Sequence, residues 1–222
     1  MPFQKAEKSK AWLKMSIEGV AGSGKTKTSL MIATLMSKKG IALIDSEHGS
    51  SKLFADEFDF NVLDLEENFS LDNYLKAIKE AASIGCDFLI VDSMSHAWMG
   101  SGGALEQINE IADKSTSKNK FIGWNVVTPL INELIDTILG LKMHVIVTFR
   151  SKTEYQIQAN EKGKMTPVRV GMKPVFRDEV DYEFYVNATM DSECVFSIYK
   201  TKCSKLINYM RKNPDCKDLV AI

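Results

Sequence analysis

Short apolar runs alternate with segments of helical spacing along the first two-thirds of the chain. Residues 13–18, 41–44, 88–91 and 145–149 form runs with the length and composition of buried strands. Helical periodicity predicts helices over residues 25–37, 70–83 and 125–139, the second capped by Ser70 or Asp72 and the third with Pro129 near its first turn. This alternation predicts an α/β fold with a mostly parallel, twisted sheet and helices on both faces.

Two polar stretches interrupt this rhythm. Residues 100–123 and 151–177 are rich in glycine and in polar or basic side chains, and we expect them to be long loops. Period-2 segments between residues 180 and 199 predict antiparallel strands that extend the sheet at its C-terminal side. We therefore expect residues 1–10 to form a short charged N-terminal arm and residues 11–222 to form a single domain.

Composition narrows the class of protein. The chain has 222 residues and a formal net charge of -1, so any nucleic-acid binding must come from a local patch. The charged N-terminus lacks the apolar core of a signal peptide, and no apolar run approaches membrane-spanning length. Cysteines are scattered, which argues against a zinc site or a disulfide framework and favours reduced thiols in the cytoplasm.

A phosphate-binding motif lies between the first predicted strand and the first predicted helix. Gly19-Val20-Ala21-Gly22-Ser23-Gly24-Lys25-Thr26 matches G-x-x-x-x-G-K-[ST]. Glycines let backbone N–H groups curl around an anion, and the helix that follows points its positive end at the phosphates. Lys25 is expected to bridge the β- and γ-phosphates of ATP and Thr26 to coordinate Mg²⁺, while Lys27 completes the nucleotide-binding set.

Two carboxylates follow predicted strands. Asp92 has the position of a Walker B aspartate that holds Mg²⁺ through water, the alternative being an ordinary turn residue. Many P-loop ATPases place a glutamate next, but here Ser93 follows, so a catalytic base must come from elsewhere. Glu47 is our candidate because it follows residues 41–44 at the carboxyl end of a parallel strand, where ligands bind; the alternative is a solvated loop carboxylate.

These elements together resemble a known family. Ile44-Asp45-Ser46-Glu47-His48 resembles the strand-end motif of bacterial RecA recombinases, and Val91-Asp92-Ser93 resembles their Walker B element. Tyr199-Lys200-Thr201-Lys202 resembles a late K-x-K element of the same proteins. The resemblance covers roughly residues 11 to 205, and the chain looks most like the minimal RecA-core ATPases of phages.

The resemblance carries specific expectations. It implies a RecA-like P-loop NTPase fold, Glu47 as the base for ATP hydrolysis, and a homo-oligomer with ATP sites at its subunit interfaces. Lys200 and Lys202 would then reach the ATP of a neighbouring subunit. It further implies a role in single-strand annealing or recombination, in the host cytoplasm if the chain is phage-encoded.

The chain also departs from the recombinases. They carry a glutamine at the end of the strand before their second DNA loop, whereas this chain has Thr148-Phe149-Arg150. Thr148 and Arg150 are therefore our candidates for sensing phosphate. The N-terminal arm is shorter than the usual polymerisation helix, so filament formation does not follow from the resemblance.

A basic segment follows this strand. Residues 150–177 contain seven Lys or Arg residues and two Glu residues, a net charge of +5 in a chain of net -1. Such a segment suits a nucleic-acid backbone, with an aromatic ring available for base stacking; the alternative is a solvated surface loop. The candidate DNA-binding residues are Lys152, Tyr155, Lys162, Lys164 and Arg169.

The sequence thus predicts a Mg²⁺-dependent ATPase that acts on single-stranded DNA. Two alternatives stay open: a small-molecule kinase with an arginine-bearing lid, and an ATP-gated partner switch or loader with negligible turnover. The three histidines lack the spacing of metal ligands. We do not expect the chain to bind a membrane.

Overall fold

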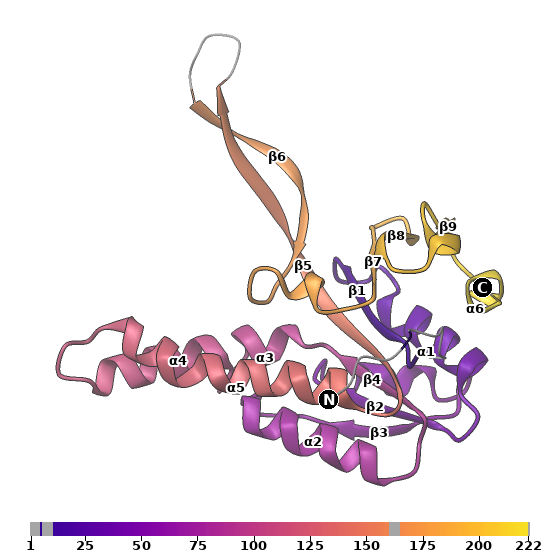
Figure 1. Ribbon diagram of the computed structural model, residues 1–222, viewed down its shortest axis with the longest axis horizontal. Helices are drawn as coiled ribbons and strands as arrows, with labels where there is room; N and C mark the ends of the chain where they lie inside the picture. The colour runs from indigo at the N-terminus through magenta and orange to yellow at the C-terminus, as the bar shows by residue number, and fades with distance from the viewer. Residues whose placement is uncertain (1–4, 6–10, 160–164, 222) are drawn as a thin grey trace.

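The computed structural model describes residue 5, residues 11–159 and residues 165–221, with side chains omitted for part of 153–170. Its strands form one sheet in the order β3-β2-β4-β5-β1-β7-β8-β9, with β6 paired to β5 (Figure 1). The strands are β1 Lys14–Gly19, β2 Ile41–Asp45, β3 Asn61–Asp64, β4 Phe88–Asp92, β5 His144–Ala159, β6 Met165–Pro174, β7 Val186–Met190, β8 Val195–Thr201 and β9 Met210–Lys212. Pairing is parallel from β3 to β7 and antiparallel for β7–β8, β8–β9 and β5–β6. The predicted mostly parallel sheet is confirmed.

Helices cover both faces of the parallel part. They are α1 Lys25–Met36, α2 Leu71–Ser83, α3 Ser95–Met99, α4 Ala104–Lys114, α5 Lys120–Gly140 and α6 Lys217–Val220, with 3-10 turns η1 Ser50–Phe54, η2 Val180–Tyr182 and η3 Ser204–Leu206. On β4, Leu89 and Val91 pack into the core under α2 and α5, whereas Phe88 and Ile90 pack into the core under α1. This alternation explains why the run reads as continuously apolar. Ser70 caps α2 by accepting a hydrogen bond from the Asn73 backbone N–H.

The loop expected over residues 100–123 is wrong. The segment forms α4, a short turn and the start of α5, which together extend from the sheet as a helical pair (Figure 1). Ile108 and Ala112 supply a narrow buried stripe, while polar residues fill the exposed face and mask the helical period. A Cβ on Gly123 would lie 2.4 Å from the Ile108 carbonyl oxygen, so the close approach of the two helices requires glycine there. Pro129 lies inside α5, not in its first turn.

The C-terminal prediction needs a correction too. The predicted antiparallel strands at the C-terminal side are confirmed in β8 and β9, but β7 pairs with β1 in parallel. The expected strand around Tyr182 and Phe184 is instead η2 and a turn, which carry the chain back to the start of β7. Strand β3 was not predicted, because it is a short edge strand that is only half-buried.

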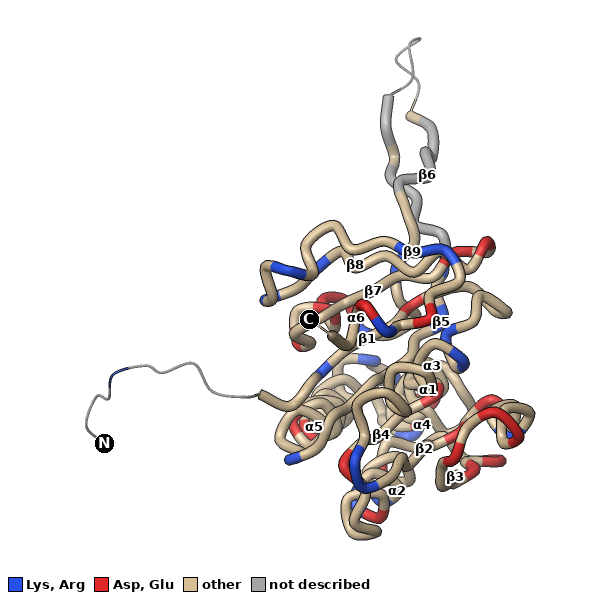
Figure 2. The backbone as a smooth tube through the Cα atoms, turned by 90° about the vertical axis from the view of Figure 1, so that its right-hand side faces the viewer, with Lys and Arg blue, Asp and Glu red and all other residues tan. Residues whose placement is uncertain are grey.

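A long β-hairpin replaces the loop expected over residues 151–177. Strand β5 continues beyond Phe149 to Ala159 and pairs with β6 from Ser151↔Pro174 to Ala159↔Met165. The hairpin rises away from the rest of the sheet (Figure 1), and the perpendicular view shows β7, β8 and β9 on the side of the molecule from which it leaves (Figure 2). Ile157 and Met165 on the hairpin are apolar residues that lie exposed to solvent, so these positions did not mark a buried strand in the sequence. None of the helices in the described part of the chain is long and apolar enough to cross a membrane.

Candidate nucleotide site

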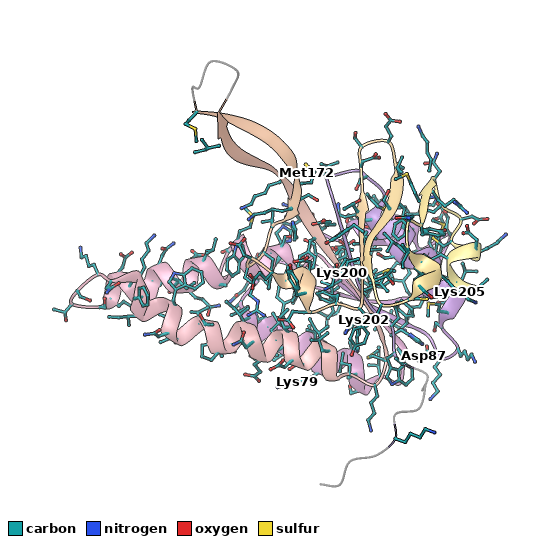
Figure 3. The ribbon with its side chains drawn as sticks, turned by 45° about the horizontal axis from the view of Figure 1, so that its top comes forward. Lys79, Asp87, Met172, Lys200, Lys202 and Lys205 are labelled. Carbon is teal, nitrogen blue, oxygen red and sulfur yellow. The ribbon has the colours of Figure 1, made fainter. Side chains whose placement is uncertain are left out.

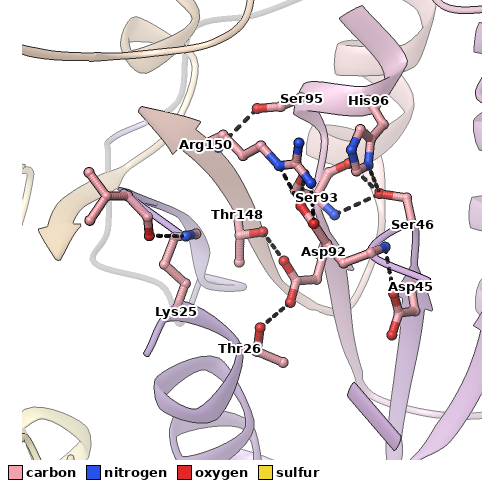
Figure 4. A network of polar contacts seen from close by, with 12 residues as sticks. Lys25, Thr26, Asp45, Ser46, Asp92, Ser93, Ser95, His96, Thr148 and Arg150 are labelled. Atoms are coloured by element: carbon pink, nitrogen blue, oxygen red, sulfur yellow. Dashed lines mark hydrogen bonds and ion pairs between the residues drawn. The ribbon is translucent and has the colours of Figure 1, made fainter. Parts of the chain in front are cut away.

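The glycine-rich loop joins β1 to α1 as the motif predicted. Gly22 and Gly24 have φ of 75° and 91°, values that favour glycine. Lys25 is the first residue of α1, and its Nζ donates to the carbonyl oxygens of Gly19 at 3.0 Å and Val20 at 2.8 Å (Figure 4). Burial lowers the pKa of Lys25, against the opposing charges of nearby carboxylates. The loop thus holds an ammonium at the point where its backbone can cradle an anion.

Asp92 lies at the centre of the site. It ends β4, is 3% exposed, and accepts hydrogen bonds from the hydroxyls of Thr26 and Thr148, the latter at 2.5 Å (Figure 4). Burial raises the pKa of Asp92, and these two hydrogen bonds oppose that shift. The two predicted Mg²⁺ ligands, Thr26 and Asp92, are therefore brought together. A hydroxyl and a carboxylate are the hard oxygen ligands that Mg²⁺ prefers beside phosphates and water, so the residues fit the ion.

Glu47 lies beside this centre and is held by Arg150. The Arg150 Nε donates to Glu47 Oε1 at 2.9 Å, and its Nη2 donates to Oε2. The Ser93 hydroxyl donates to Oε1 at 3.0 Å. Burial would raise the pKa of Glu47, but the hydrogen bonds and charge of Arg150 outweigh it and hold that pKa below its usual value. Glu47 is thus an ionised acceptor that a cation neutralises.

A shell of hydrogen bonds fixes the backbone around Glu47 and was not predicted. Asp45 accepts from the Glu47 backbone N–H at 2.6 Å and from the Ser51 N–H at 2.8 Å. Ser46 Oγ donates to the Ser93 carbonyl oxygen at 3.0 Å and lies 2.8 Å from His96 Nδ1 (Figure 4). The two Ser46 contacts form because the ends of β2 and β4 are neighbours, with Asp45 opposite Asp92, whereas the Asp45 contacts are local to the turn that follows β2. The adjacency of two strand ends, rather than any motif, is the signal that could have found them.

The two C-terminal lysines, labelled in Figure 3, lie close to the segment that leads into β7: Lys200 contacts η2, and Lys202 contacts Tyr185 beyond it. Lys200 Nζ donates to the carbonyl oxygens of Asp181 at 2.5 Å and Phe184 at 3.4 Å, and lies 5.0 Å from the centre of the Tyr182 ring. Lys202 Nζ lies 4.8 Å from the centre of the Tyr185 ring. Their expected role across a subunit interface stays a prediction.

Three of the candidate DNA-binding residues lie on the strands of the β5–β6 hairpin. Lys152 is exposed on β5 and lies opposite Lys173 on β6. The backbones of Tyr155 and Arg169 pair across the hairpin, but their side chains are outside the described set. Lys162 and Lys164 lie outside the described residues. The structure therefore places Lys152, Tyr155 and Arg169 on the two paired strands of a ribbon that begins one residue after Arg150.

A largely apolar cavity of about 460 Å³ adjoins the glycine-rich loop and the first turns of α1. Its wall is made by Gly24, Lys27, Thr28, Met31, Met190, Cys194, Asn213, Pro214 and Asp215. The Lys27 Nζ also forms an ion pair with Glu57 Oε2 at 2.6 Å and lies 5.9 Å from the centre of the Phe54 ring. An apolar hollow with a few polar groups beside a phosphate-binding loop has the character of a nucleoside site.

Comparisons with known proteins agree with this geometry. The family model described as AAA domain matches residues 11–213. Among solved structures, a KaiC-like protein from the hyperthermophilic archaeon Pyrococcus horikoshii superposes with a TM-score of 0.51 over 90% of this chain and 83% of that chain, at 14% identity. That likeness shows the fold and confirms the expected RecA-like arrangement. A search of curated proteins finds no match. Because the family model spans the glycine-rich loop, Asp92 and the C-terminal strands, this P-loop chain belongs to the AAA domain family.

Proposed function

We propose that this chain is a Mg²⁺-dependent ATPase that acts on single-stranded DNA in recombination or strand annealing, as the small RecA-core proteins of phages do. The observation that carries the proposal is the placement of Arg150. This one residue pairs with the candidate catalytic base Glu47 and stands at the foot of the basic hairpin. A contact made by the hairpin can therefore act directly on the hydrolytic site.

The ATP site is assembled from the residues described above. The loop backbone from Gly19 to Gly24 and the Lys25 ammonium would hold the phosphates, and the cavity over α1 would take the nucleoside. Thr26 and Asp92 would hold Mg²⁺, which when bound neutralises charge on the phosphates. Thr148 keeps Asp92 oriented through its hydroxyl. The Glu47 carboxylate would accept a proton from the attacking water.

Arg150 has two uses in this scheme. Paired with Glu47, it neutralises the carboxylate and lowers its basicity. Turned toward a γ-phosphate, it would release Glu47 and stabilise charge that develops during transfer. The same pair favours one alternative, an ATP-gated switch with very slow turnover, because a clasped Glu47 is a weak base.

DNA binding would use the hairpin, which lies within the segment of residues 150–177 whose net charge of +5 suits a phosphate backbone. Assembly into a homo-oligomer would bring Lys200 and Lys202 to the ATP of the next subunit. Both parts of the proposal rest on the basic segment and on the resemblance to recombinases.

Steady-state ATPase assays test the proposal. We expect measurable turnover that requires Mg²⁺ and rises when single-stranded DNA is added. Very slow turnover that does not change when DNA is added, together with tight ATP binding, would favour the ATP-gated partner switch. Phosphate transfer to a small-molecule acceptor would identify a kinase instead. A Lys25→Ala variant is the control for a contaminating ATPase, because it removes the ammonium that holds the phosphates.

A further inference from the structure

The Glu47 carboxylate is held by two separate side chains. Arg150 donates to both of its oxygens, from Nε to Oε1 at 2.9 Å and from Nη2 to Oε2. The Ser93 hydroxyl donates to Oε1 alone, at 3.0 Å. The proposed function turns Arg150 toward a γ-phosphate during hydrolysis. Among the described residues, Ser93 is then the one hydrogen-bond donor left on the carboxylate of Glu47.

Ser93 occupies the position at which many P-loop ATPases carry their catalytic glutamate. It follows Asp92 at the end of β4, whereas Glu47 follows the neighbouring strand β2. Because these two strands pair in parallel with Asp45 opposite Asp92, the hydroxyl and the carboxylate reach the same edge of the sheet. Ser93 is fully buried, so its hydroxyl proton has no solvent acceptor that could compete with Glu47.

The backbone of Ser93 is fixed on both sides. Its N–H donates to Ser46 Oγ at 2.9 Å, and its carbonyl oxygen accepts from the Tyr74 hydroxyl at 2.7 Å and from Ser46 Oγ at 3.0 Å (Figure 4). Ser46 has one hydroxyl proton and also lies 2.8 Å from His96 Nδ1. If that proton goes to His96, the Tyr74 hydroxyl still serves the carbonyl. These contacts, made by fully buried side chains of β2's end and α2, fix the point from which the Ser93 hydroxyl reaches Glu47.

We propose that Ser93 is a positioning residue that holds Oε1 of Glu47 during hydrolysis, and that Oε2, freed by Arg150, is the oxygen that accepts the proton. In that step the water oxygen forms a bond to the γ-phosphorus, and the bond from this phosphorus to the bridging oxygen breaks. ADP keeps the bonding electron pair, and the proton of the water passes to Oε2. The inference rests on the proposed function, since it requires Glu47 to be the base.

The sign of the effect on rate separates positioning from a purely electrostatic role. The hydrogen bond from Ser93 lowers the pKa of Glu47, although less than Arg150 and His96 do. If Ser93 acted only in this way, removing its hydroxyl would leave a stronger base and a faster reaction. Positioning has the opposite sign, because a misplacement of about 1 Å can cost about 10²-fold in rate. We expect positioning to dominate, since the electrostatic effect of Ser93 is the smaller one.

Steady-state and single-turnover ATPase kinetics of Ser93→Ala test the inference. We expect kcat to fall by about 10–100-fold, while KM for ATP and the Mg²⁺ concentration for half-maximal rate change by less than about twofold. In a Glu47→Gln background, adding Ser93→Ala should cost no further activity, because the serine acts through the carboxylate. Ser37→Ala is the matched control and should keep kcat. It removes a hydroxyl that donates to the Asp87 carboxylate at 2.7 Å, just before the start of β4.

A second variant covers the case in which Ser93→Ala fails to fold. Tyr74→Phe keeps the ring and removes the hydroxyl that donates to the Ser93 carbonyl oxygen, so kcat should fall by about two- to tenfold with KM unchanged. Tyr209→Phe is its control, because it removes a hydroxyl that donates to Asp218 at 2.6 Å far from the site, and it should keep kcat.

Three results overturn the inference. The first is a kcat that rises in Ser93→Ala. The second is a kcat that stays unchanged in every variant of Ser93 and Tyr74 that folds. The third is an equal loss from Ser93→Ala in the parent and the Glu47→Gln backgrounds, since the serine would then act on the Mg²⁺ site or on the fold. Full activity of Glu47→Gln alone would instead overturn the proposed base, so the two failures are distinguishable.

Discussion

Arg150 and Glu47 form a two-pronged ion pair, in which Nε donates to Oε1 at 2.9 Å and Nη2 donates to Oε2. The pair joins the end of β2 to β5 at the point where that strand leaves the body and becomes the hairpin. Planar two-bond pairs of this kind fix geometry as well as charge. The structure thus links the candidate base to the candidate DNA-binding element through one side chain.

Breaking this pair should move the pH dependence of ATP hydrolysis. Because Arg150 lowers the pKa of Glu47 against the effect of burial, activity that needs the ionised carboxylate is lost only as pH falls below the usual glutamate range. In Arg150→Gln the two largest causes that lower the pKa of Glu47 are removed, while burial and the smaller effects of His96 and Ser93 remain, so the acid limb of the kcat/KM profile should shift to higher pH. The midpoint of the acid limb is the quantity to compare, because the variant also loses the proposed contact of Arg150 with phosphate, which would lower the rate at every pH. An unchanged midpoint would show that Glu47 is not the titrating base.

Replacing the base itself should separate binding from chemistry. Glu47→Gln keeps the side-chain size and loses the proton acceptor, so hydrolysis should fall by about 10²–10⁴-fold while ATP binding persists. Glu66→Gln, an exposed carboxylate near the same edge of the sheet, is the matched control and should leave both unchanged. Turnover of Glu47→Gln within a few-fold of the parent chain would move the base to another residue.

The α4–α5 pair provides a test of packing that is independent of function. Gly123→Ala places a methyl group 2.4 Å from the Ile108 carbonyl oxygen, so the helices must separate, at a cost of about 1–3 kcal/mol in the free energy of unfolding. Gly140→Ala, in the same helix, meets no atom within 4 Å and should be neutral or slightly stabilising. Urea unfolding of the two variants measures the difference. Equal stabilities would mean that α4 and α5 do not pack closely in solution.

The fold was most predictable where both faces of a strand are buried. The runs at residues 41–44 and 88–91 are continuously apolar because successive side chains enter opposite cores, and the structure has β2 and β4 there. Prediction failed where burial is narrow or absent, as in α4, in the edge strand β3 and in the hairpin. The parallel pairing of β7 with β1 depends on a chain crossing that strand periodicity does not encode.

The site shows a similar division. A local motif located Lys25 and Thr26, and strand ends located Asp92 and Glu47. The Ser93 hydroxyl bound to Glu47 and the Ser46–His96 contact escaped prediction, because each joins side chains far apart in the chain. Arg150 was predicted as a phosphate sensor, but its pairing with Glu47 required knowing that β2, β4 and β5 are neighbours.

Mixing two inactive variants tests the oligomeric ATP site. If Lys200 and Lys202 complete the site of a neighbouring subunit, Lys200→Ala/Lys202→Ala and Glu47→Gln should each be inactive alone. Their mixture should regain part of the activity, because some interfaces then combine an intact Glu47 with intact lysines. Specific activity of the parent chain should also rise with protein concentration. No rescue, with activity independent of dilution, would place the complete site within one chain.

Salt dependence tests the role of the hairpin in DNA binding. Each phosphate neutralised on a single strand contributes about −0.7 to the slope of log affinity against log salt concentration. Lys152→Ala should therefore flatten the slope by up to about 0.7, and the triple change Lys162→Ala/Lys164→Ala/Arg169→Ala by up to about 2. Lys79→Ala removes an exposed lysine from α2, on the far side of the molecule from the hairpin in Figure 1, and should leave the slope unchanged. Labelled oligonucleotides titrated with salt, with and without a non-hydrolysable ATP analogue, give the slopes.

A slope that the hairpin variants do not alter would mean that the DNA contacts lie elsewhere. In that case Arg150 would link Glu47 to an element that does not touch DNA, and the ATP-gated partner switch would become the better account of the chain.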